Sequence, residues 1–269
     1  MTILQALVLG AVQGLTEFLP VSSSAHLLIV PHLLGWNDPG IAFSAAIHLG
    51  TLAALLAYFA RDVVHLVREA VAGLWERDLR RSPACLMAWS IVPATLPAVA
   101  AGLSLRDFFE SDARQITVVA GALIALSALL LLAERVGSLD RSIGEIGFWR
   151  IQFIGLCQAI ALIPGSSRSG CTIMAGLFVG LKRHQAARFS FILGLPAITG
   201  AGGLELIGLL RADPGPEEVL NLVVGITAAA VSGFLTIGLL LRFLEHHGTH
   251  VFAYYRIALG LFLLFLYTG

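Results

Sequence analysis

The sequence predicts an all-α, polytopic membrane protein, and three observations lead to that fold class. Hydrophobic residues make up 57% of the 269 positions and charged residues only 13%, about half the charged share of ordinary soluble domains. The mean hydropathy is +0.86, and the 28 glycines agree with the high frequency of glycine in membrane helices. Apolar stretches of about 20 residues, long enough to cross the hydrocarbon core, recur along the whole chain.

The charge balance and the cysteines exclude several other classes of protein. Seventeen basic and seventeen acidic residues cancel, so the chain lacks the excess positive charge of a nucleic-acid-binding protein. Cys85, Cys157 and Cys171 lie in apolar contexts without a CxxC pair, so neither a zinc site nor a disulfide framework is predicted. We expect a single integral membrane domain over residues 1–269, surrounded by membrane lipids.

Six apolar stretches carry few or no charges, and each is predicted to form one full membrane span. They cover residues 41–60, 84–104, 116–134, 188–210, 219–241 and 251–268. Charged or turn-rich joints separate them, and the clearest are residues 61–83 and 211–218.

Two further apolar stretches, residues 3–35 and 147–181, are too long for one crossing. Proline and serine interrupt each near its middle, in the segments Phe18–His26 and Leu162–Gly170. A helix broken at membrane depth needs surrounding protein or a wet cavity. We therefore expect two re-entrant helical hairpins whose tips lie inside the protein; two pairs of short ordinary crossings are the alternative.

The order of elements, a hairpin followed by three spans, occurs twice. The two halves are residues 1–138 and 139–269, and a shift of 144 residues aligns Pro20 with Pro164 and Ser22 with Ser166. A half with an odd number of spans must repeat upside down, which is the inverted-topology architecture of many transporters. In that arrangement the two hairpin tips meet near the middle of the membrane.

The basic residues predict the orientation, because cytoplasmic loops carry an excess of Lys and Arg. Thirteen of the seventeen fall on one side, in the loops 61–83, 135–150, 179–188 and 242–256. Three fall on the other side: Arg106, Arg114 and Arg211. The first side is therefore predicted to be cytoplasmic, and the first hairpin is predicted to open to the outside.

Ionisable groups at membrane depth are expensive, so they indicate function by default. Three lie at the predicted breaks: Glu17, His26 and Arg168. Glu17 and His26, nine residues apart across the first break, suit proton transfer, whereas Arg168 suits two-pronged binding of phosphate. The structural alternative is an ion pair between Glu17 and Arg168 that locks the hairpins, with His26 as a hydrogen-bonded core residue.

Hydroxyl side chains surround these ionisable groups at both breaks. They are Thr16, Ser22, Ser23, Ser24, Ser166, Ser167, Ser169 and Thr172. Glycine and proline among them leave backbone amides free at new helix starts, and such amides bind anions. The second break is therefore predicted to cradle phosphate. Gln13, one turn before Glu17, either caps a backbone group or holds a phosphate oxygen, and Glu205 is expected at a wet or interfacial helix end.

The two segments resemble the signatures of the bacterial undecaprenyl-diphosphatase family, integral membrane enzymes also known as bacitracin-resistance proteins. The resemblance rests on Gln13-Gly-Leu-Thr-Glu-Phe-Leu-Pro-Val-Ser-Ser-Ser-Ala-His26 and Pro164-Gly-Ser-Ser-Arg-Ser-Gly-Cys-Thr172, and it extends over the whole chain. It implies hydrolysis of undecaprenyl diphosphate to undecaprenyl phosphate and inorganic phosphate, which recycles the lipid carrier for cell-wall synthesis. It also implies a homodimer in the bacterial inner membrane, an active site open to the outside, and competition with bacitracin for the same lipid.

Within this resemblance, Glu17, His26 and Arg168 match essential positions of the family, and Ser22 and Ser23 match its hydroxyl pair. We expect catalysis by four residues: Glu17, His26, Ser23 and Arg168. We expect substrate binding by seven: Gln13, Ser22, Ser24, Ser166, Ser167, Ser169 and Thr172. The resemblance implies a divalent cation, Mg2+ or Ca2+, for which Glu17 is the one carboxylate at either tip. The chain departs from the family at Gln13, where glutamate is common, and at His48, where glutamine is common.

Several alternatives stay open at the level of sequence. The nucleophile is Ser23, His26 or a water. A transporter of lipid phosphates or anions shares the inverted-repeat architecture, although it gives no reason for a Glu–His pair beside an anion site. The acid-phosphatase type of lipid phosphatase is excluded, because its Pro-Ser-Gly-His motif is absent and no lysine precedes the first hairpin.

Overall fold

The computed structural model describes residues 1–105, 108–109, 115–212 and 215–268, and its elements are helices. The bounds in chain order are α1 Ile3–Phe18, α2 Ser23–Leu33, α3 Gly40–Tyr58, α4 Ala60–Trp75, α5 Pro83–Ser104, α7 Ile116–Val136, the short 3-10 helix η2 Ile143–Glu145, α8 Phe148–Ile160, α9 Arg168–Phe178, α10 Arg183–Ala212, α11 Pro216–His246 and α12 His250–Thr268. The predicted all-α class is confirmed. Arg106 and Arg114 lie outside the described residues, as do the side chains of Glu205 and Arg211.

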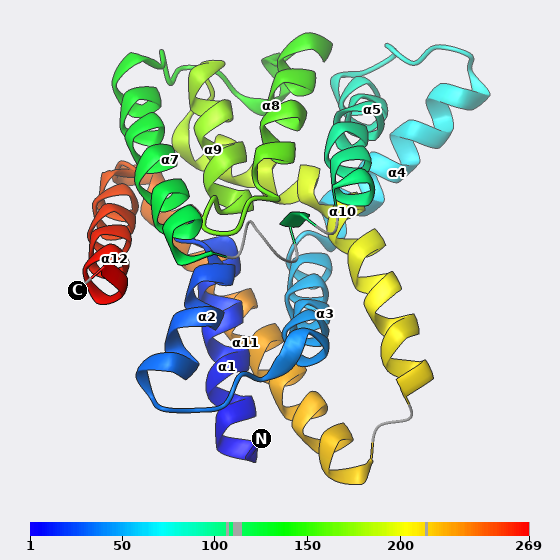
Figure 1. Ribbon diagram of the computed structural model, residues 1–269. Helices are drawn as coiled ribbons and strands as arrows, with labels where there is room; N and C mark the ends of the chain where they lie inside the picture. The colour runs from blue at the N-terminus through cyan, green and yellow to red at the C-terminus, as the bar shows by residue number, and fades with distance from the viewer. Residues whose placement is uncertain (106–107, 110–114, 213–214, 269) are drawn as a thin grey trace.

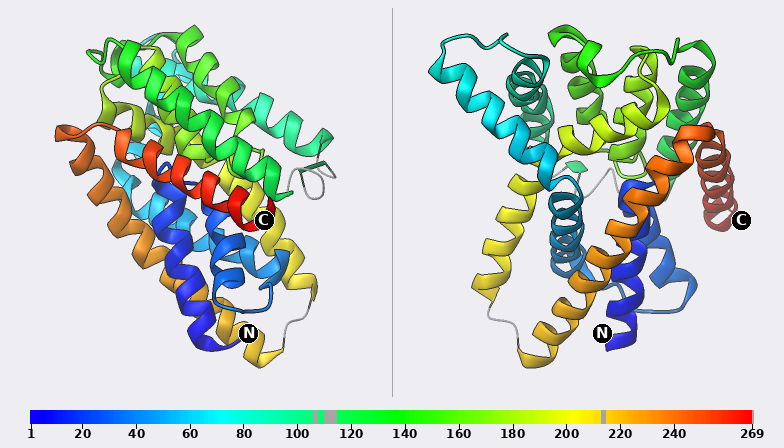
Figure 2. Two further views of the ribbon diagram at one scale, coloured as in Figure 1. Left: turned by 60° about the vertical axis from the view of Figure 1, so that its left-hand side comes forward. Right: turned by 180° about the vertical axis from the view of Figure 1, so that it is seen from behind.

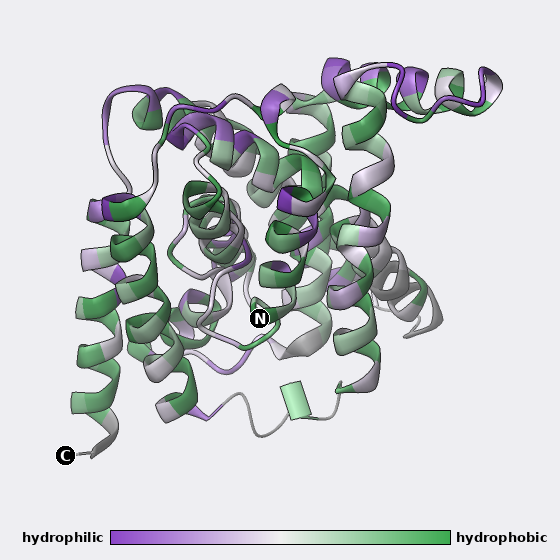
Figure 3. Ribbon diagram, turned by 90° about the horizontal axis from the view of Figure 1, so that it is seen from above, coloured by the Kyte–Doolittle hydropathy of each residue, from purple (hydrophilic) through white to green (hydrophobic). Residues whose placement is uncertain are grey.

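Several helices have the length and hydropathy of membrane spans. Among the described residues, α5, α7 and α11 qualify as single helices, and α3 with α4 qualifies as a pair bent by 74°. Hydrophobic residues run along most of the helices in Figure 3. The chain is therefore a multi-pass membrane protein, as its composition predicts.

Helix α4, Ala60–Trp75, occupies much of the charged joint predicted at residues 61–83, so that joint is largely helical. Val64, Val67 and Val71 recur at helical spacing and are exposed, while charged residues take other positions along the same helix. This is the pattern of an amphipathic helix at a membrane surface. An ion pair between Asp62 and Arg188 ties the start of α4 to α10.

Glycines bring helix backbones together at two seams. A Cβ atom on Gly10 of α1 would lie 2.2 Å from the carbonyl oxygen of Gly225 in α11. A Cβ atom on Gly155 of α8 would lie 2.2 Å from the carbonyl oxygen of Ala94 in α5. Such close approach through small residues is usual between membrane helices. In the views of Figures 1 and 2, α1 runs beside α11 and α8 beside α5, so each seam fixes the first helix of a broken pair.

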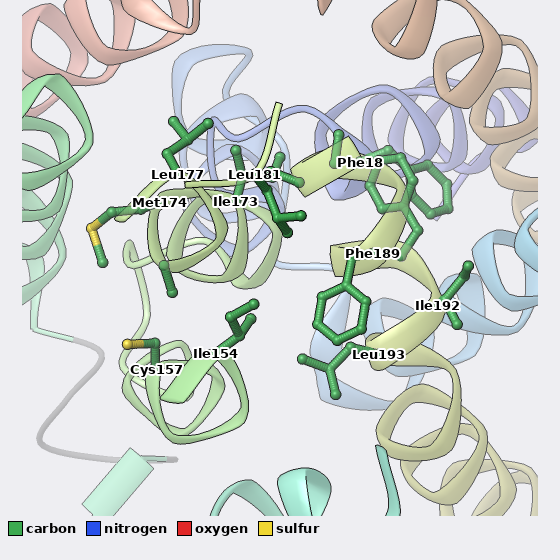
Figure 4. Close-up of a cluster of buried hydrophobic side chains, with 14 of the residues drawn as sticks. Phe18, Ile154, Cys157, Ile173, Met174, Leu177, Leu181, Phe189, Ile192 and Leu193 are labelled. Carbon is green, nitrogen blue, oxygen red and sulfur yellow. The ribbon is translucent and has the colours of Figure 1, made fainter. Parts of the chain in front are cut away.

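The largest hydrophobic cluster includes the end of α1 and buried side chains of α9, the helices next to the two breaks. Figure 4 shows Phe18, the last residue of α1, among buried side chains from α8, α9 and α10. Phe18 packs edge-to-face against Phe191 of α10, with ring centroids 5.3 Å apart, a preferred aromatic geometry. Both rings are fully buried. This packing holds the end of α1, and with it the neighbouring Glu17, in one position.

Candidate active site

The first helix break places a new helix start close to Glu17. Helix α1 ends at Phe18, the backbone becomes extended at Leu19, and α2 begins at Ser23. Ser22 is the N-cap with φ +75°, and its hydroxyl accepts a hydrogen bond from the Ala25 amide at 3.4 Å. Serine is a preferred N-cap because its oxygen satisfies one of the free amides of the first turn.

The second break has the same local geometry. Helix α9 begins at Arg168, after the N-cap Ser167 with φ +66°, and the Ser167 hydroxyl accepts from the Gly170 amide at 3.1 Å. Gly165 has φ +90°, and a Cβ atom there would lie 2.4 Å from the carbonyl oxygen of Val119. Glycine is therefore required at this point of the tip.

Two hydrogen bonds connect the tips to each other. The Gly165 amide donates to Ser24 Oγ at 3.3 Å, and the Ser169 hydroxyl donates to the carbonyl oxygen of Leu19 at 3.0 Å. In each case the serine two positions after an N-cap reaches the backbone of the opposite tip. The N-caps Ser22 and Ser167 correspond at a shift of 145 residues. The sequence shift of 144, which pairs Ser22 with Ser166, is therefore one residue out at the tips.

Glu17 lies at the centre of the cluster and is buried, with 9% of its surface exposed. Its Oε2 atom accepts hydrogen bonds from Ser23 Oγ at 2.7 Å and Gln13 Nε2 at 3.1 Å. Its Oε1 atom lies 3.5 Å from a terminal nitrogen of Arg168, and His48 Nε2 lies 3.8 Å from Oε2. The predicted proximity of Glu17 and Arg168 is thus present, and Ser23 is the hydroxyl that contacts the carboxylate.

The imidazole of His26 has partners other than Glu17 or Ser23. Its Nδ1 atom lies 2.8 Å from the carbonyl oxygen of Ser22, and its Nε2 atom lies 2.6 Å from the hydroxyl of Tyr255 in α12. The geometry therefore links Glu17 to Ser23 directly and leaves His26 as a separate group.

The guanidinium of Arg168 occupies space that a glycine leaves open. A Cβ atom on Gly194 of α10 would lie 2.0 Å from one terminal nitrogen of Arg168. That nitrogen also donates to the carbonyl oxygen of Ser190 at 3.4 Å, while the buried Nε atom has no hydrogen-bond partner among the described residues. Arg168 thus keeps one unpaired donor in this part of the chain.

The remaining predicted residues divide into those with structural partners and one without. Ser22, Ser24, Ser167 and Ser169 cap helices or connect the tips. The Thr172 hydroxyl bonds to the backbone of Arg168 and to the hydroxyl of Ser190. In this set, the buried hydroxyl of Ser166 is the one without a hydrogen-bond partner among the residues that the structure describes.

Free backbone amides at the N-termini of α2 and α9 contribute positive potential at both tips. The third residue of α2 and of α9 donates to its N-cap serine. The first two amides of each helix, at Ser23, Ser24, Arg168 and Ser169, have no acceptor within the described residues. The site therefore combines two helix N-termini with free amides and the guanidinium of Arg168, and groups of this kind bind anions.

The comparison with known proteins adds sequence evidence over the full chain. The family described as bacitracin resistance protein BacA matches residues 6–262. The chain belongs to the BacA family. A protein of Thermomicrobium roseum named undecaprenyl-diphosphatase is 49% identical, with 98% of each chain covered. Two others with that name come from Chlorobium luteolum, 46% identical over 100% of this chain and 98% of the relative, and Myxococcus xanthus, 48% identical over 99% and 89%.

The resemblance drawn from the two motifs is therefore confirmed. Three residues of this BacA-family chain that contact the site were missed or misassigned from the sequence. His48, beside Glu17, had no assigned role; Tyr255, beside His26, was not singled out. Arg256 counts toward the cytoplasmic loop 242–256 in the charge balance, although it also falls within the predicted span 251–268; it lies in α12 and is fully buried. Tyr255 is 229 positions from His26, and Arg256 is 90 positions from its partner Ser166, so no local pattern marks these contacts.

A divalent cation can be tested against the oxygen atoms of this site. The described residues hold no group of three or more His, Cys, Asp or Glu side chains that could bind a metal. Beside the Glu17 carboxylate, however, the Oε1 atom of Gln13 is buried and has no hydrogen-bond partner within the described ranges. Carboxylate and amide oxygens suit Mg2+ and Ca2+, so these two residues fit such an ion when phosphate oxygens complete its coordination.

Proposed function

We propose that this protein hydrolyses undecaprenyl diphosphate to undecaprenyl phosphate and inorganic phosphate. The reaction recycles the lipid carrier for cell-wall synthesis and confers resistance to bacitracin, which competes for the same lipid. The activity is supported by relatives named undecaprenyl-diphosphatase, to which this chain is similar over nearly its whole length. The observation that carries the proposal is the 2.7 Å hydrogen bond from Ser23, at the start of α2, to Glu17, whose carboxylate also lies 3.5 Å from Arg168, at the start of α9.

Ser23 is the proposed nucleophile. Glu17 accepts the Ser23 proton as the serine oxygen bonds to the terminal phosphorus, and the bridging oxygen leaves with undecaprenyl phosphate. A water then attacks the phosphoserine, which releases inorganic phosphate and returns the proton to Ser23. A carboxylate hydrogen-bonded to a hydroxyl is the usual arrangement of an activated nucleophile. Both ring nitrogens of His26 already have partners, so His26 is proposed to orient the substrate or transfer a proton.

Arg168 and the helix N-termini are proposed to stabilise the phosphoryl group during transfer. Phosphoryl transfer depends mostly on positioning and on neutralising charge at the equatorial oxygens. The contact between Arg168 and Glu17 is long, at 3.5 Å, and a diphosphate can compete for the same guanidinium. Gln13, Ser166 and the free amides complete the proposed phosphate contacts. A bound Mg2+ or Ca2+, held by Glu17, Gln13 and the substrate, would neutralise part of the diphosphate charge.

The membrane arrangement is part of the same proposal. Halves 1–138 and 139–269 form an inverted repeat of a re-entrant hairpin and three spans, in the bacterial inner membrane, with the active site open to the outside. The matching N-caps, the reciprocal bonds between the tips and the two glycine seams support the repeat. The excess of Lys and Arg in the loops supports the orientation. The family resemblance supports a homodimer.

The test is release of phosphate from undecaprenyl diphosphate by purified protein, with and without a chelator. Glu17→Gln and Arg168→Lys are expected to abolish most release, whereas Ser138→Ala, in a loop outside the site, should match the wild type. Wild-type rates in both site variants would contradict the assignment. Transmembrane movement of lipid phosphate in proteoliposomes without phosphate release would favour the transporter instead.

A further inference from the structure

Two adjacent residues of α12 reach the two hairpin tips. Tyr255 places its hydroxyl 2.6 Å from Nε2 of His26 in the first hairpin. Arg256 donates from one terminal nitrogen to the carbonyl oxygens of Gly165, at 3.3 Å, and Ser166, at 2.9 Å, in the second hairpin. Tyr254, which precedes these two residues in α12, is exposed.

The burial of Arg256 is unusual and needs an explanation. Its side chain is fully buried, and within the described residues no carboxylate pairs with it. The Nε atom and the other terminal nitrogen have no hydrogen-bond partner in the described part of the chain. A buried guanidinium without a counter-charge is destabilising in a protein and more so at membrane depth. A buried arginine that carries this penalty indicates a role in function.

The contacts of Arg256 lie at the start of α9. The two carbonyls that it binds come directly before the N-cap Ser167 and Arg168. Arg256 also packs against the first turn, since a Cβ atom on Gly170 would lie 2.7 Å from its terminal nitrogen. Because these carbonyls point toward Arg256, the backbone of the tip is fixed in the conformation that leaves the amides of Arg168 and Ser169 free.

We propose that Tyr255 and Arg256 are positioning residues, one for each hairpin, and that α12 thereby holds His26 and the phosphate-binding tip in register. This inference rests on the proposed phosphatase activity. Arg256 acts through the backbone of the tip, and Tyr255 acts through the imidazole. The two hydrogen bonds between the tips then keep the position of each tip dependent on the other.

The decisive experiment compares Arg256→Met with Arg242→Met, the same change at an exposed arginine of α11. The measurements are kcat and KM for undecaprenyl diphosphate and the inhibition constant of inorganic phosphate. That constant is independent of the fraction of folded enzyme, so a merely structural loss would leave it unchanged. We expect the Arg256 variant to lose about 100-fold in kcat, the effect of a displacement near 1 Å, with a weaker phosphate inhibition and little change in KM.

Arg256→Lys is expected to fall between the wild type and the Met variant, because an ammonium reaches the carbonyls without the guanidinium fork. Tyr255→Phe removes only the hydroxyl, and we expect about a tenfold loss in kcat, while Tyr254→Phe should match the wild type. If Arg256→Met does not fold, the Lys and Phe variants decide. Phosphate inhibition and kcat within about twofold of the controls would overturn the inference, whereas an inactive wild type would overturn the proposed function.

Discussion

Replacing Gly14 with alanine should impair catalysis although the residue touches no substrate. Gly14 lies in α1, one turn before Glu17, where α1 packs on α11. A Cβ atom there would lie 2.4 Å from the carbonyl oxygen of Ala229, 2.6 Å from the amide nitrogen of Gly233 and 2.0 Å from the hydroxyl of Ser232. The serine side chain can rotate away, but the two backbone atoms of α11 cannot.

The size of the effect follows from these distances. A normal carbon–oxygen contact is about 3.3 Å, so the 2.4 Å contact requires α1 and α11 to separate by about 0.9 Å. Glu17 moves with α1, whereas Ser23 and Arg168 belong to α2 and α9. A displacement near 1 Å can lower a rate by about 100-fold. Overpacking of this kind also lowers the free energy of unfolding by about 1–3 kcal/mol.

The assay is phosphate release from undecaprenyl diphosphate per folded molecule, together with thermal unfolding in the same detergent. Gly121→Ala is the matched control, because a Cβ atom on this α7 glycine meets nothing within 4 Å. We expect Gly14→Ala to lose both kcat and melting temperature relative to this control. Equal values for the two variants would refute the argument that the glycine seam positions Glu17.

Three further outcomes are expected. Ser23→Ala should lower phosphate release by about 1000-fold or more and prevent trapping of a phosphoenzyme; a phosphorylated His26 in this variant would instead make the histidine the nucleophile. Glu134→Ala should cost about 3 kcal/mol of unfolding free energy, measured by thermal unfolding, because its carboxylate binds Arg183 and accepts from the amide and hydroxyl of Thr249; an unchanged melting temperature would contradict this. Chelation of divalent cations should lower phosphate release and Mg2+ should restore it, whereas full activity in the chelator would contradict the cation.

The helices could be predicted from the sequence because membrane spans are marked by long apolar runs. The predicted spans 84–104 and 116–134 agree closely with α5, Pro83–Ser104, and α7, Ile116–Val136. Helix α4 could not be recognised in this way, since its charges resemble those of a loop. Its valines lie on one face only when the segment is helical. A search for uniformly apolar stretches does not detect that pattern.

The members of the site were predictable, but most of their pairings were not. Proline and serine at both breaks identify the tips, because a helix interrupted at membrane depth needs a special environment. Whether Glu17 contacts Ser23 or His26 depends on the direction in which α2 leaves Ser22, where φ is +75°. Sequence does not specify that direction. The contacts of Arg256 could not be predicted either, since only the packing of α12 against the second tip distinguishes it from an arginine at a membrane surface.

The matched geometry of the two tips explains how a repeat can support an asymmetric reaction. At the shift of 145 residues, Ser23 and Arg168 occupy the same position, the first residue after the N-cap. This position projects from a helix N-terminus, where the dipole favours negative charge. One half supplies a hydroxyl next to a carboxylate, and the other supplies a permanent cation. A phosphoryl group between the tips would therefore meet a nucleophile from one half and charge neutralisation from the other, although the two backbones are built alike.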